Sequence, residues 1–167
     1  VCTGSGRPGG LGEAILRRLG EEGYRLVVTD VDGSGTNHLA KPDEMEAVTE
    51  RLRSGGAEVF SHACDVRSAE SVKHLFNAVM EHFGRVDVLI NNAGIMYTGI
   101  TEGFSIAQAH EQMNTNYYGA IRTTQAVLPN MRKAGNGLII NVSSIAGRIA
   151  APYFGTYCAT KFALEAY

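Results

Sequence analysis

Residues 1–12, with the sequence VCTGSGRPGGLG, decide the fold predicted for this chain. Residues 1–3 have the apolar character of a strand end. Leu11, Ile15 and Leu19 then recur at helical spacing. Glycines between a strand and a helix let backbone N–H groups approach a pyrophosphate, and the helix N-terminus adds partial positive charge. A glycine-rich loop alone could be only a flexible turn, but this position indicates a dinucleotide-binding fold.

Strand-like apolar runs and helix-like periodic segments alternate along the rest of the chain, which is typical of a parallel α/β sheet. We expect further strands over residues 25–30, 57–63, 86–90 and 138–142. We expect helices over residues 43–54, 72–83 and 105–133 and around Tyr157, and a loop over residues 33–42. Right-handed crossovers then predict a single-domain, Rossmann-type doubly wound sheet over residues 1–167, ordered 3-2-1-4-5.

The composition describes an ordinary globular chain. Of its 167 residues, 44% are hydrophobic and 19% are charged, and the net charge of −2 favours neither nucleic acid nor an anionic membrane as a partner. No apolar stretch approaches the ~20 residues of a membrane-spanning helix. Cys2, Cys64 and Cys158 are scattered and odd in number, which favours reduced thiols in a cytoplasmic protein. The histidines show no metal-ligand clustering, so we expect no metal site.

Asp30 lies at the tip of the second expected strand, where a dinucleotide fold places the carboxylate that binds the adenosine ribose hydroxyls. The alternative is a turn or cap residue. A carboxylate at this point would repel a 2′-phosphate, so we favour NAD over NADP as the cofactor. Arg7 of the glycine-rich loop could instead contact such a phosphate, so NADP is possible.

Ser144, Tyr157 and Lys161 form the most informative constellation of the chain. A tyrosine and a lysine four residues apart share one face of a helix, and a serine just past a strand can be brought beside them. The neighbouring ammonium group favours the phenolate and lowers the tyrosine pKa from its usual value of about 10. Tyr157 is therefore a candidate general acid–base, although this spacing alone also arises by chance on solvated helices.

These residues belong to a series of motifs that together resemble the short-chain dehydrogenase/reductase family along the whole chain. The motifs are Thr3-Gly4 through Gly12, Cys64-Asp65-Val66, Asn91-Asn92-Ala93-Gly94, Asn116-Tyr117-Tyr118-Gly119, Asn141-Val142-Ser143-Ser144 and Tyr157-x-x-x-Lys161. The resemblance implies an NAD(P)-dependent oxidoreductase that transfers hydride between nicotinamide and a secondary alcohol or ketone. It also implies a homodimer or homotetramer.

The resemblance also assigns roles to individual residues. Tyr157 is the implied general acid–base, Lys161 lowers its pKa and binds the nicotinamide ribose, and Ser144 orients the substrate oxygen. Asn116 holds a water that links Lys161 to solvent. The alternatives are that Ser144 caps a turn and that Asn116 bonds its own helix backbone. The implied cofactor-binding residues are Thr3, Gly4, Gly10, Leu11, Gly12, Asp30, Asp65, Val66, Asn92, Ala93, Gly94, Tyr157 and Lys161.

The glycine-rich loop departs from the family spacing. The family places three residues between its first two loop glycines, whereas five separate Gly4 from Gly10. Residues 8–9 then read as an insertion that widens the loop. A Gly-x-Gly-x-x-Gly register over residues 4–9 is the alternative. We prefer the first register, because Gly10 and Gly12 directly open the following helix.

The length is the second departure, because family members continue beyond the helix that bears Tyr157. We therefore expect the sequence to be incomplete at both ends and to lack the C-terminal part of the family fold. The strand over residues 138–142 would then be a sheet edge that exposes apolar side chains, and the 167 residues alone should be aggregation-prone and inactive.

Four apolar or aromatic residues near the catalytic constellation bear on the class of substrate. Met96, Tyr97, Ile145 and Tyr153 lie where a substrate pocket could be, which hints at an apolar substrate, although they could equally belong to the core.

Two alternative functions were compared with the oxidoreductase. A dinucleotide sensor without turnover would show substitutions at the catalytic residues, and none is visible. A lyase or epimerase on the same scaffold is disfavoured, because halohydrin-type relatives lose the glycine loop and the lysine.

Overall fold

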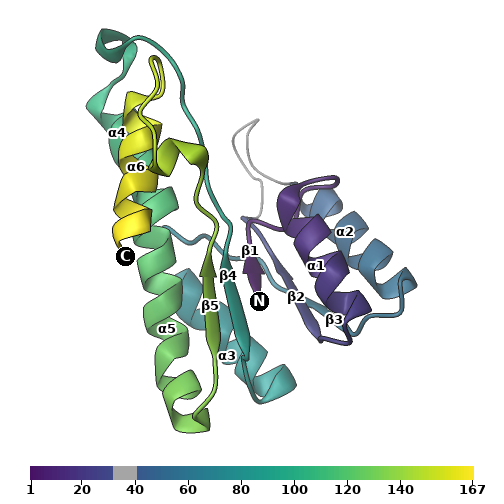
Figure 1. Ribbon diagram of the computed structural model, residues 1–167. Helices are drawn as coiled ribbons and strands as arrows, with labels where there is room; N and C mark the ends of the chain where they lie inside the picture. Colours follow the sequence, from purple (N-terminus) through teal and green to yellow (C-terminus); the bar gives the residue numbers. More distant parts are fainter. Residues whose placement is uncertain (32–40) are drawn as a thin grey trace.

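Short parallel strands form the central sheet of the computed structural model, which describes residues 1–31 and 41–167 (Figure 1). Most of the loop expected over residues 33–42 falls outside them. The order β3-β2-β1-β4-β5 confirms the predicted topology. Because all neighbours pair in parallel, the strands end at one edge of the sheet, uppermost in Figure 1. The strands are β1 (Cys2–Thr3), β2 (Leu26–Thr29), β3 (Val59–Ser61), β4 (Val88–Asn91) and β5 (Leu138–Asn141).

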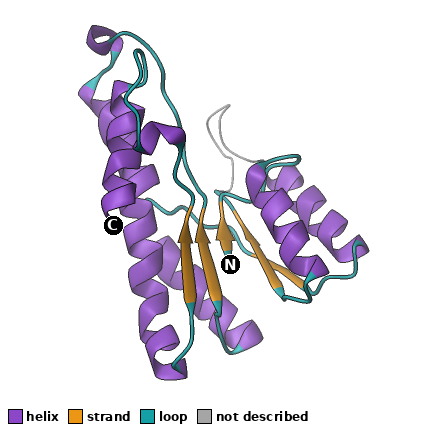
Figure 2. Cartoon of the chain, viewed as in Figure 1, coloured by secondary structure: helices purple, strands orange, loops and turns teal. Residues whose placement is uncertain are grey.

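Helices cover both faces of this sheet, which makes it the expected Rossmann-type α/β fold (Figure 2). On one face lie α1 (Leu11–Glu21) and α2 (Pro42–Ser54). On the other face, α3 (Ala69–Phe83) packs against α5 (Gly119–Ala134). Near the strand ends the chain adds η1 (Thr101–Gly103), α4 (Ile106–Met113), η3 (Ile145–Gly147) and α6 (Gly155–Ala166).

Neighbouring strand residues enter different apolar cores, because side chains of a strand point alternately to the two faces. Val27 of β2 packs with residues of α3 and α5, whereas Leu26 and Val28 pack with residues of α1 and α2. In β4, Leu89 and Ile90 divide between the same two cores. Every residue of β2 is therefore buried, which explains the nearly continuous apolar run in the sequence.

The helix predicted over residues 105–133 is not one α-helix. It consists of α4, a π-helical turn η2 (Asn114–Tyr118) and α5 in direct succession. Ser105 lies just before α4 and caps it, accepting a hydrogen bond from the backbone N–H of Gln108 (3.2 Å). Pro129 lies inside α5. The π turn was missed because it continues the helical pattern of the sequence, and π turns of this kind are frequent at functional sites.

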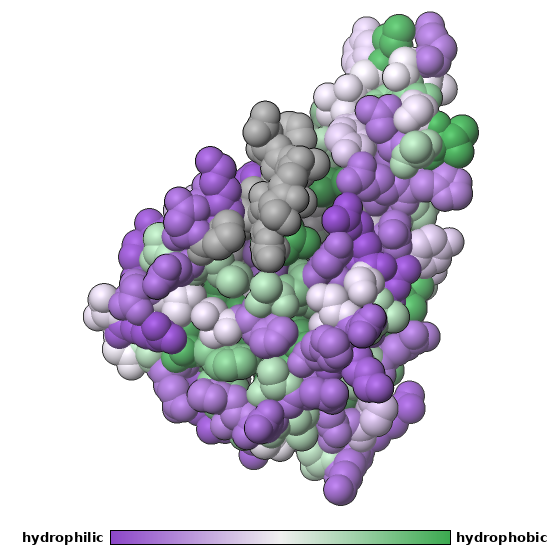
Figure 3. All heavy atoms as spheres, turned by 180° about the vertical axis from the view of Figure 1, so that it is seen from behind, coloured by the Kyte–Doolittle hydropathy of each residue, from purple (hydrophilic) through white to green (hydrophobic). Residues whose placement is uncertain are grey.

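The strand β5 forms an edge of the sheet, as expected. Ile139 packs against the core beside α5, whereas Leu138 and Ile140 point to the opposite face and are 53% and 41% exposed. Figure 3 shows the molecule from behind, and this surface is mainly hydrophilic. Some hydrophobic residues lie at its projecting end, near the segment between β4 and α4. Met96 and Ile100 of that segment are exposed.

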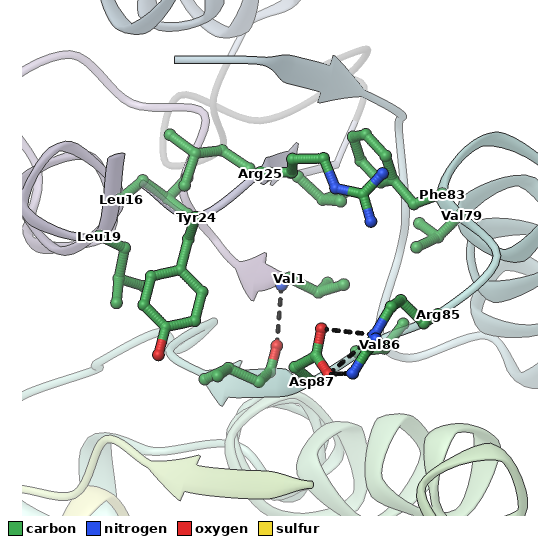
Figure 4. A pocket seen from close by; sticks show the side chains of 13 residues that line it. Val1, Leu16, Leu19, Tyr24, Arg25, Val79, Phe83, Arg85, Val86 and Asp87 are labelled. Carbon is green, nitrogen blue, oxygen red and sulfur yellow. Dashed lines mark hydrogen bonds and ion pairs between the residues drawn. The ribbon is translucent and has the colours of Figure 1, made fainter. Parts of the chain in front are cut away.

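A small pocket of about 60 Å³ lies at the opposite end of the sheet (Figure 4). The amino group of Val1 donates a hydrogen bond to the carbonyl of Val88 there (2.9 Å), and Tyr24, Phe83 and Arg85 contribute to its walls. Ligands of open α/β sheets bind outside the carboxyl ends of the strands, so we assign this pocket no function.

None of the helices in residues 1–31 and 41–167 has both the length and the apolar character that a membrane-spanning helix needs. In the same residues, His, Cys, Asp and Glu side chains do not form a group of three or more that could hold a metal ion.

Candidate cofactor and active site

The loop after β1 packs so closely against its neighbours that glycine is required at two positions. Gly4 has φ +63°, and a Cβ built on it would lie 2.6 Å from the Cα of Ala93. A Cβ on Gly12 would lie 2.7 Å from the Cα of Ser5. The loop after β1, the loop after β4 and the start of α1 therefore meet at the carboxyl edge of the sheet.

Helix α1 begins directly after Gly10, its N-cap residue, which agrees with the preferred glycine register. Among the described residues no side chain caps this helix, and its first backbone N–H groups have no partner within it. The widened part of the loop is held separately: the N–H of Gly9 donates to Oε2 of Glu13 (2.6 Å), and Oε1 of Glu13 pairs with Nε of Arg51 (2.9 Å). The uncapped helix end is thus suited to an anion.

Asp30 is fixed at the end of β2 by backbone hydrogen bonds. Its Oδ2 accepts from the N–H of Gly6 (3.0 Å) and its Oδ1 from the N–H of Val31 (2.9 Å). Burial raises the pKa of this carboxyl above its usual value. A Cβ on Gly6 would lie 2.7 Å from the Cβ of Asp30, so this glycine is packed against the carboxylate, a contact that the preferred register did not anticipate.

A cleft of about 250 Å³ opens between these loops. Most of the predicted cofactor-binding residues line it, which brings together positions from the N-terminal quarter and the middle of the chain. These are Gly4, Gly10, Leu11, Gly12, Asp30, Asp65, Val66, Asn92, Ala93 and Gly94. The cleft is also lined by residues that were not among the predicted cofactor-binding positions: Val31, Arg67, Ile95, Glu111 and Thr115. Cys64, from the Cys64-Asp65-Val66 motif, and Arg7, from the glycine-rich loop, line it as well.

Thr3 does not line the cleft but supports its floor. Its Oγ1 accepts hydrogen bonds from the backbone N–H groups of Asn92 (3.2 Å) and Ala93 (3.1 Å). The amide of Asn92 donates in return to the carbonyls of Thr3 (2.9 Å) and Gly4 (2.9 Å). Thr3 and Asn92 thus fasten β1 to β4 under the glycine-rich loop, which is a structural contribution to the site.

Asp65 and Arg67 form an ion pair at the far end of the cleft. The Arg67 guanidinium donates to Asp65 (2.9 Å) and reaches Oε1 of Glu111 (3.2 Å), whose Oε2 accepts from the hydroxyl of Tyr97 (2.7 Å). Burial alone would raise the pKa of Asp65, but the hydrogen bonds from Arg67 lower it overall. No local sequence pattern indicates this cluster, because its members come from three separate segments.

Lys161 is a buried cation, with 5% of its surface exposed. Its Nζ donates to the carbonyl of Val142, just past β5 (2.8 Å), and lies 5.8 Å from the centre of the Tyr157 ring. Burial lowers the pKa of this ammonium group. Tyr157 itself is half-buried on the same helix, one turn earlier. The structure therefore brings the predicted tyrosine and lysine together at the carboxyl end of β5.

Ser144 follows β5 and does cap a turn, as one alternative held. Its Oγ accepts a hydrogen bond from the backbone N–H of Ala146 (3.1 Å), the middle residue of η3. Accepting this bond leaves the hydroxyl proton of Ser144 able to donate elsewhere. Capping and a role toward a substrate oxygen are therefore compatible.

Asn116 is buried inside the π turn, and its side chain is engaged outside its own helix. Its Nδ2 donates to the carbonyl of Ile95 (2.8 Å) and to Oγ1 of Thr160 (3.0 Å), and its Oδ1 accepts from the N–H of Ile95 (2.8 Å). The alternative that this amide bonds its own helix backbone is wrong. Asn116 instead links a wall of the cleft to the residue before Lys161.

The residues expected near a substrate are mostly at the surface. Met96, Ile145 and Tyr153 are exposed, so assigning these three to the core is wrong. Tyr153 also has φ +68°, which is unusual for a residue with a side chain, and its carbonyl accepts from the N–H of Gly99 (2.9 Å). Tyr97 is half-buried in its contact with Glu111.

The parallel sheet, the glycine-lined cleft and the neighbouring tyrosine and lysine define a Rossmann-type α/β protein with a site at the carboxyl edge. A family model described as short chain dehydrogenase matches residues 1–167, and the chain belongs to this family. The resemblance stated from the sequence is thereby confirmed.

Curated relatives are similar over nearly all of this chain. The 3-oxoacyl-(acyl-carrier-protein) reductase FabG of Staphylococcus epidermidis is 35% identical over 96% of the chain. A 3-ketodihydrosphingosine reductase of Bacteroides thetaiotaomicron is 37% identical over 98% of it. The chain spans 62% and 54% of the lengths of these two relatives.

Solved structures agree with this family. An alcohol dehydrogenase from the archaeon Thermococcus sibiricus, complexed with 5-hydroxy-NADP, has a TM-score of 0.86 and 36% identity, with coverage of 98% of this chain and 65% of its own. An NAD⁺-bound xylitol dehydrogenase has a TM-score of 0.89 and 30% identity, with coverage of 99% and 60%. Similar proteins thus bind either nicotinamide dinucleotide.

Proposed function

We propose that the protein containing this chain is an NAD(P)-dependent oxidoreductase that interconverts a secondary alcohol and a ketone. The main observation in its support is that two features lie together at the carboxyl ends of the strands. One is the glycine-lined cleft with Asp30 in its wall, and the other is the buried Lys161 beside Tyr157. Asn116 joins them, because it bonds both Ile95 of the cleft and Thr160 of α6.

The cleft fits a nicotinamide dinucleotide. The uncapped start of α1 offers free backbone N–H groups and partial positive charge to a pyrophosphate, and the close contact at Gly12 keeps that helix end near the loop. Asp30 would accept hydrogen bonds from the adenosine ribose, and Asp65 and Val66 would flank the adenine. The bound cofactor supplies the hydride acceptor or donor.

The proton is handled by residues of this chain. Tyr157 would give its proton to a carbonyl oxygen in reduction, or take one from an alcohol in oxidation. The ammonium group of Lys161, which lies beside the Tyr157 ring, would stabilise negative charge that develops on this side chain in the transition state. Ser144 would donate its free hydroxyl proton to the same substrate oxygen and so orient it. Since both amide protons of Asn116 are engaged, a water on the path from Lys161 to solvent would donate to an oxygen of this residue, either Oδ1 or the backbone carbonyl.

Turnover of secondary alcohols tests this function. The full-length protein that contains this chain is incubated with NAD⁺ and a panel of alcohols, and NADH absorbance is followed. Tyr157→Phe should lower kcat by about 100-fold or more, the usual contribution of a general acid–base. Tyr24→Phe, which removes the hydroxyl of an exposed tyrosine at the opposite end of the sheet, serves as the matched control. Turnover that survives Tyr157→Phe excludes this mechanism, and cofactor binding without any turnover favours the sensor.

Asp30 favours NAD as the cofactor. Asp30→Ser removes the ribose acceptor and the repulsion of a 2′-phosphate, so the ratio of kcat/KM for NAD to that for NADP should fall by about 10-fold or more. Glu44→Gln is the control, because it removes a nearby negative charge whose carboxylate bonds the N–H of Lys41 at the start of α2. A preference for NADP in the unchanged protein would refute the assigned role of Asp30.

The substrate and the assembly are part of the same proposal. Exposed apolar side chains of Met96, Ile145 and Tyr153 come from segments at the carboxyl edge of the sheet, which favours an apolar substrate. Two relatives are named for 3-oxoacyl and 3-keto substrates. A homodimer or homotetramer is expected from the family resemblance, and light scattering of the full-length protein measures it.

A further inference from the structure

Gln112 is a fully buried amide near the end of α4, with 0% of its surface exposed. Its Oε1 accepts a hydrogen bond from the backbone N–H of Tyr97 (3.0 Å), and its Nε2 donates to Oγ1 of Thr156 (2.7 Å). Tyr97 belongs to the loop after β4, and Thr156 directly precedes Tyr157 on α6. One side chain thus joins this loop to the helix that bears the proposed acid–base.

Asn116 repeats the arrangement one turn further along. It bonds the backbone of Ile95, two residues before Tyr97, and Oγ1 of Thr160, four residues after Thr156. The two amides are four residues apart and face the same loop and the same helix. Each of the two threonines stands immediately before a residue of the proposed active site, Tyr157 or Lys161. The loop and α6 are therefore held by two buried bridges.

Burying an amide costs free energy unless its donor and acceptor atoms are hydrogen-bonded. The Gln112 side chain therefore favours one arrangement of the loop after β4 and α6, which an apolar side chain in its place would not do. If it is removed, the N–H of Tyr97 and the hydroxyl of Thr156 each lose a partner. The N–H of Gly99 bonds the carbonyl of Tyr153, so the loop and the approach to α6 remain in contact. What is lost is the connection beside Tyr157.

We propose that Gln112 is a positioning residue, which holds the first turn of α6 against the loop after β4 and thereby sets the position of Tyr157 relative to the substrate. The inference rests on the proposed function, since it assigns a role in the same reaction. Gln112 touches neither cofactor nor substrate in this role and acts through Thr156.

The test compares isosteric variants in the full-length protein. Gln112→Met keeps the size of the side chain and removes the amide, and Thr156→Val removes the hydroxyl at constant shape. Each should lower kcat by about 10- to 100-fold, the effect of a small misplacement of a catalytic group, while the Kd for NADH measured by fluorescence changes by a smaller factor. Each should also shift the pH profile of kcat, because Tyr157 moves relative to Lys161. Thr156→Ser keeps the hydroxyl and should retain the wild-type kcat and pH profile.

A double variant and a control sharpen the comparison. Gln112→Met combined with Thr156→Val should lower kcat no further than Gln112→Met alone, because Thr156→Val removes a hydrogen bond that Gln112→Met has already removed. Gln125→Met, on the exposed surface of α5, should behave as wild type. Amide hydrogen exchange over residues 155–161 should speed up in Gln112→Met, and this readout does not depend on turnover.

The outcomes separate this inference from the proposed function. If the unchanged protein turns over no alcohol or ketone, the proposed function fails, while faster exchange over residues 155–161 in Gln112→Met still supports the bridge. If the protein is active and Gln112→Met keeps the wild-type kcat and pH profile, the positioning role is refuted and the function stands. A fall in kcat with an unchanged pH profile, or loss of activity in Thr156→Ser, also refutes it.

Discussion

Gly4 lies where the loop after β1 approaches the loop after β4 too closely for a side chain. A methyl group there would meet the backbone of Ala93 at 2.6 Å, and φ +63° adds strain for any side chain. Gly4→Ala should therefore destabilise the fold by about 2–4 kcal/mol, combining overpacking with left-handed strain. Gly23→Ala is a matched control, because Gly23 has φ +84° and nothing within 4 Å. Urea denaturation measures both, and equal losses would contradict the close contact.

Lys161 should make stability depend on pH in the alkaline range. Burial lowers its pKa in the folded state below the ordinary value of 10.5. Between the two values the unfolded chain binds more protons than the folded one, so the free energy of unfolding rises with pH in that window. Lys161→Met should remove this rise, measured as Tm against pH. Lys73→Met, which removes an exposed lysine of α3, should retain it, and loss of the rise in both variants would assign it to another group.

At the residue scale, candidate residues could be predicted from the sequence, but most of their contacts could not. Asp30, Tyr157 and Lys161 could be proposed because their spacing and their position after strands suggest their chemistry, and the structure places them at the carboxyl ends of the strands. The contact between Arg67 and Glu111 could not be predicted, because these residues meet only after α4 has packed beside the cleft. Gln112 did carry a signal, since it lies four residues before Asn116, but polar residues at helical spacing are common.

At the element scale, the π turn η2 places the buried side chain of Asn116 between the loop after β4 and α6. Asn116→Ala removes its three hydrogen bonds to Ile95 and Thr160 and leaves buried groups without partners, so it should destabilise the fold by about 2–4 kcal/mol. Asn114→Ala is the matched control in the same turn. Chemical denaturation compares them, and an equal loss in both variants would mean that the turn itself, rather than the amide contacts, determines stability.

Strands and their order could be predicted at the element scale, because apolar runs covered on both faces and right-handed crossovers leave few alternatives. The π turn could not, because residues 114–118 continue an amphipathic helix in sequence and the inserted residue shows only in the backbone bonds. Its position depends on how Asn116 meets Ile95 and Thr160, which belong to other elements.

For the molecule as a whole, the uncovered strand β5 predicts association of the 167-residue chain. Leu138 and Ile140 expose apolar surface beside unpaired backbone groups. Ile140→Lys should reduce light scattering by this chain at a given concentration, because a charge on an edge strand opposes pairing. Ile106→Lys is the control, because it replaces an isoleucine of α4 that is 75% exposed. It tests whether the loss of any exposed isoleucine is enough to reduce the scattering. Equal effects of both changes would exclude β5 as the associating edge.

The central place of β1 has a consequence for how the chain acquires its fold during synthesis. Cys2 pairs with Val28 on one side and with Ile90 on the other. The first partner leaves the ribosome soon after β1, whereas the second follows only after α2, β3 and α3 have been made. A sheet of β1, β2 and β3 alone would have an open edge at β1, and the arrival of β4 closes that edge and assembles the floor of the cleft, since Thr3 and Asn92 then meet.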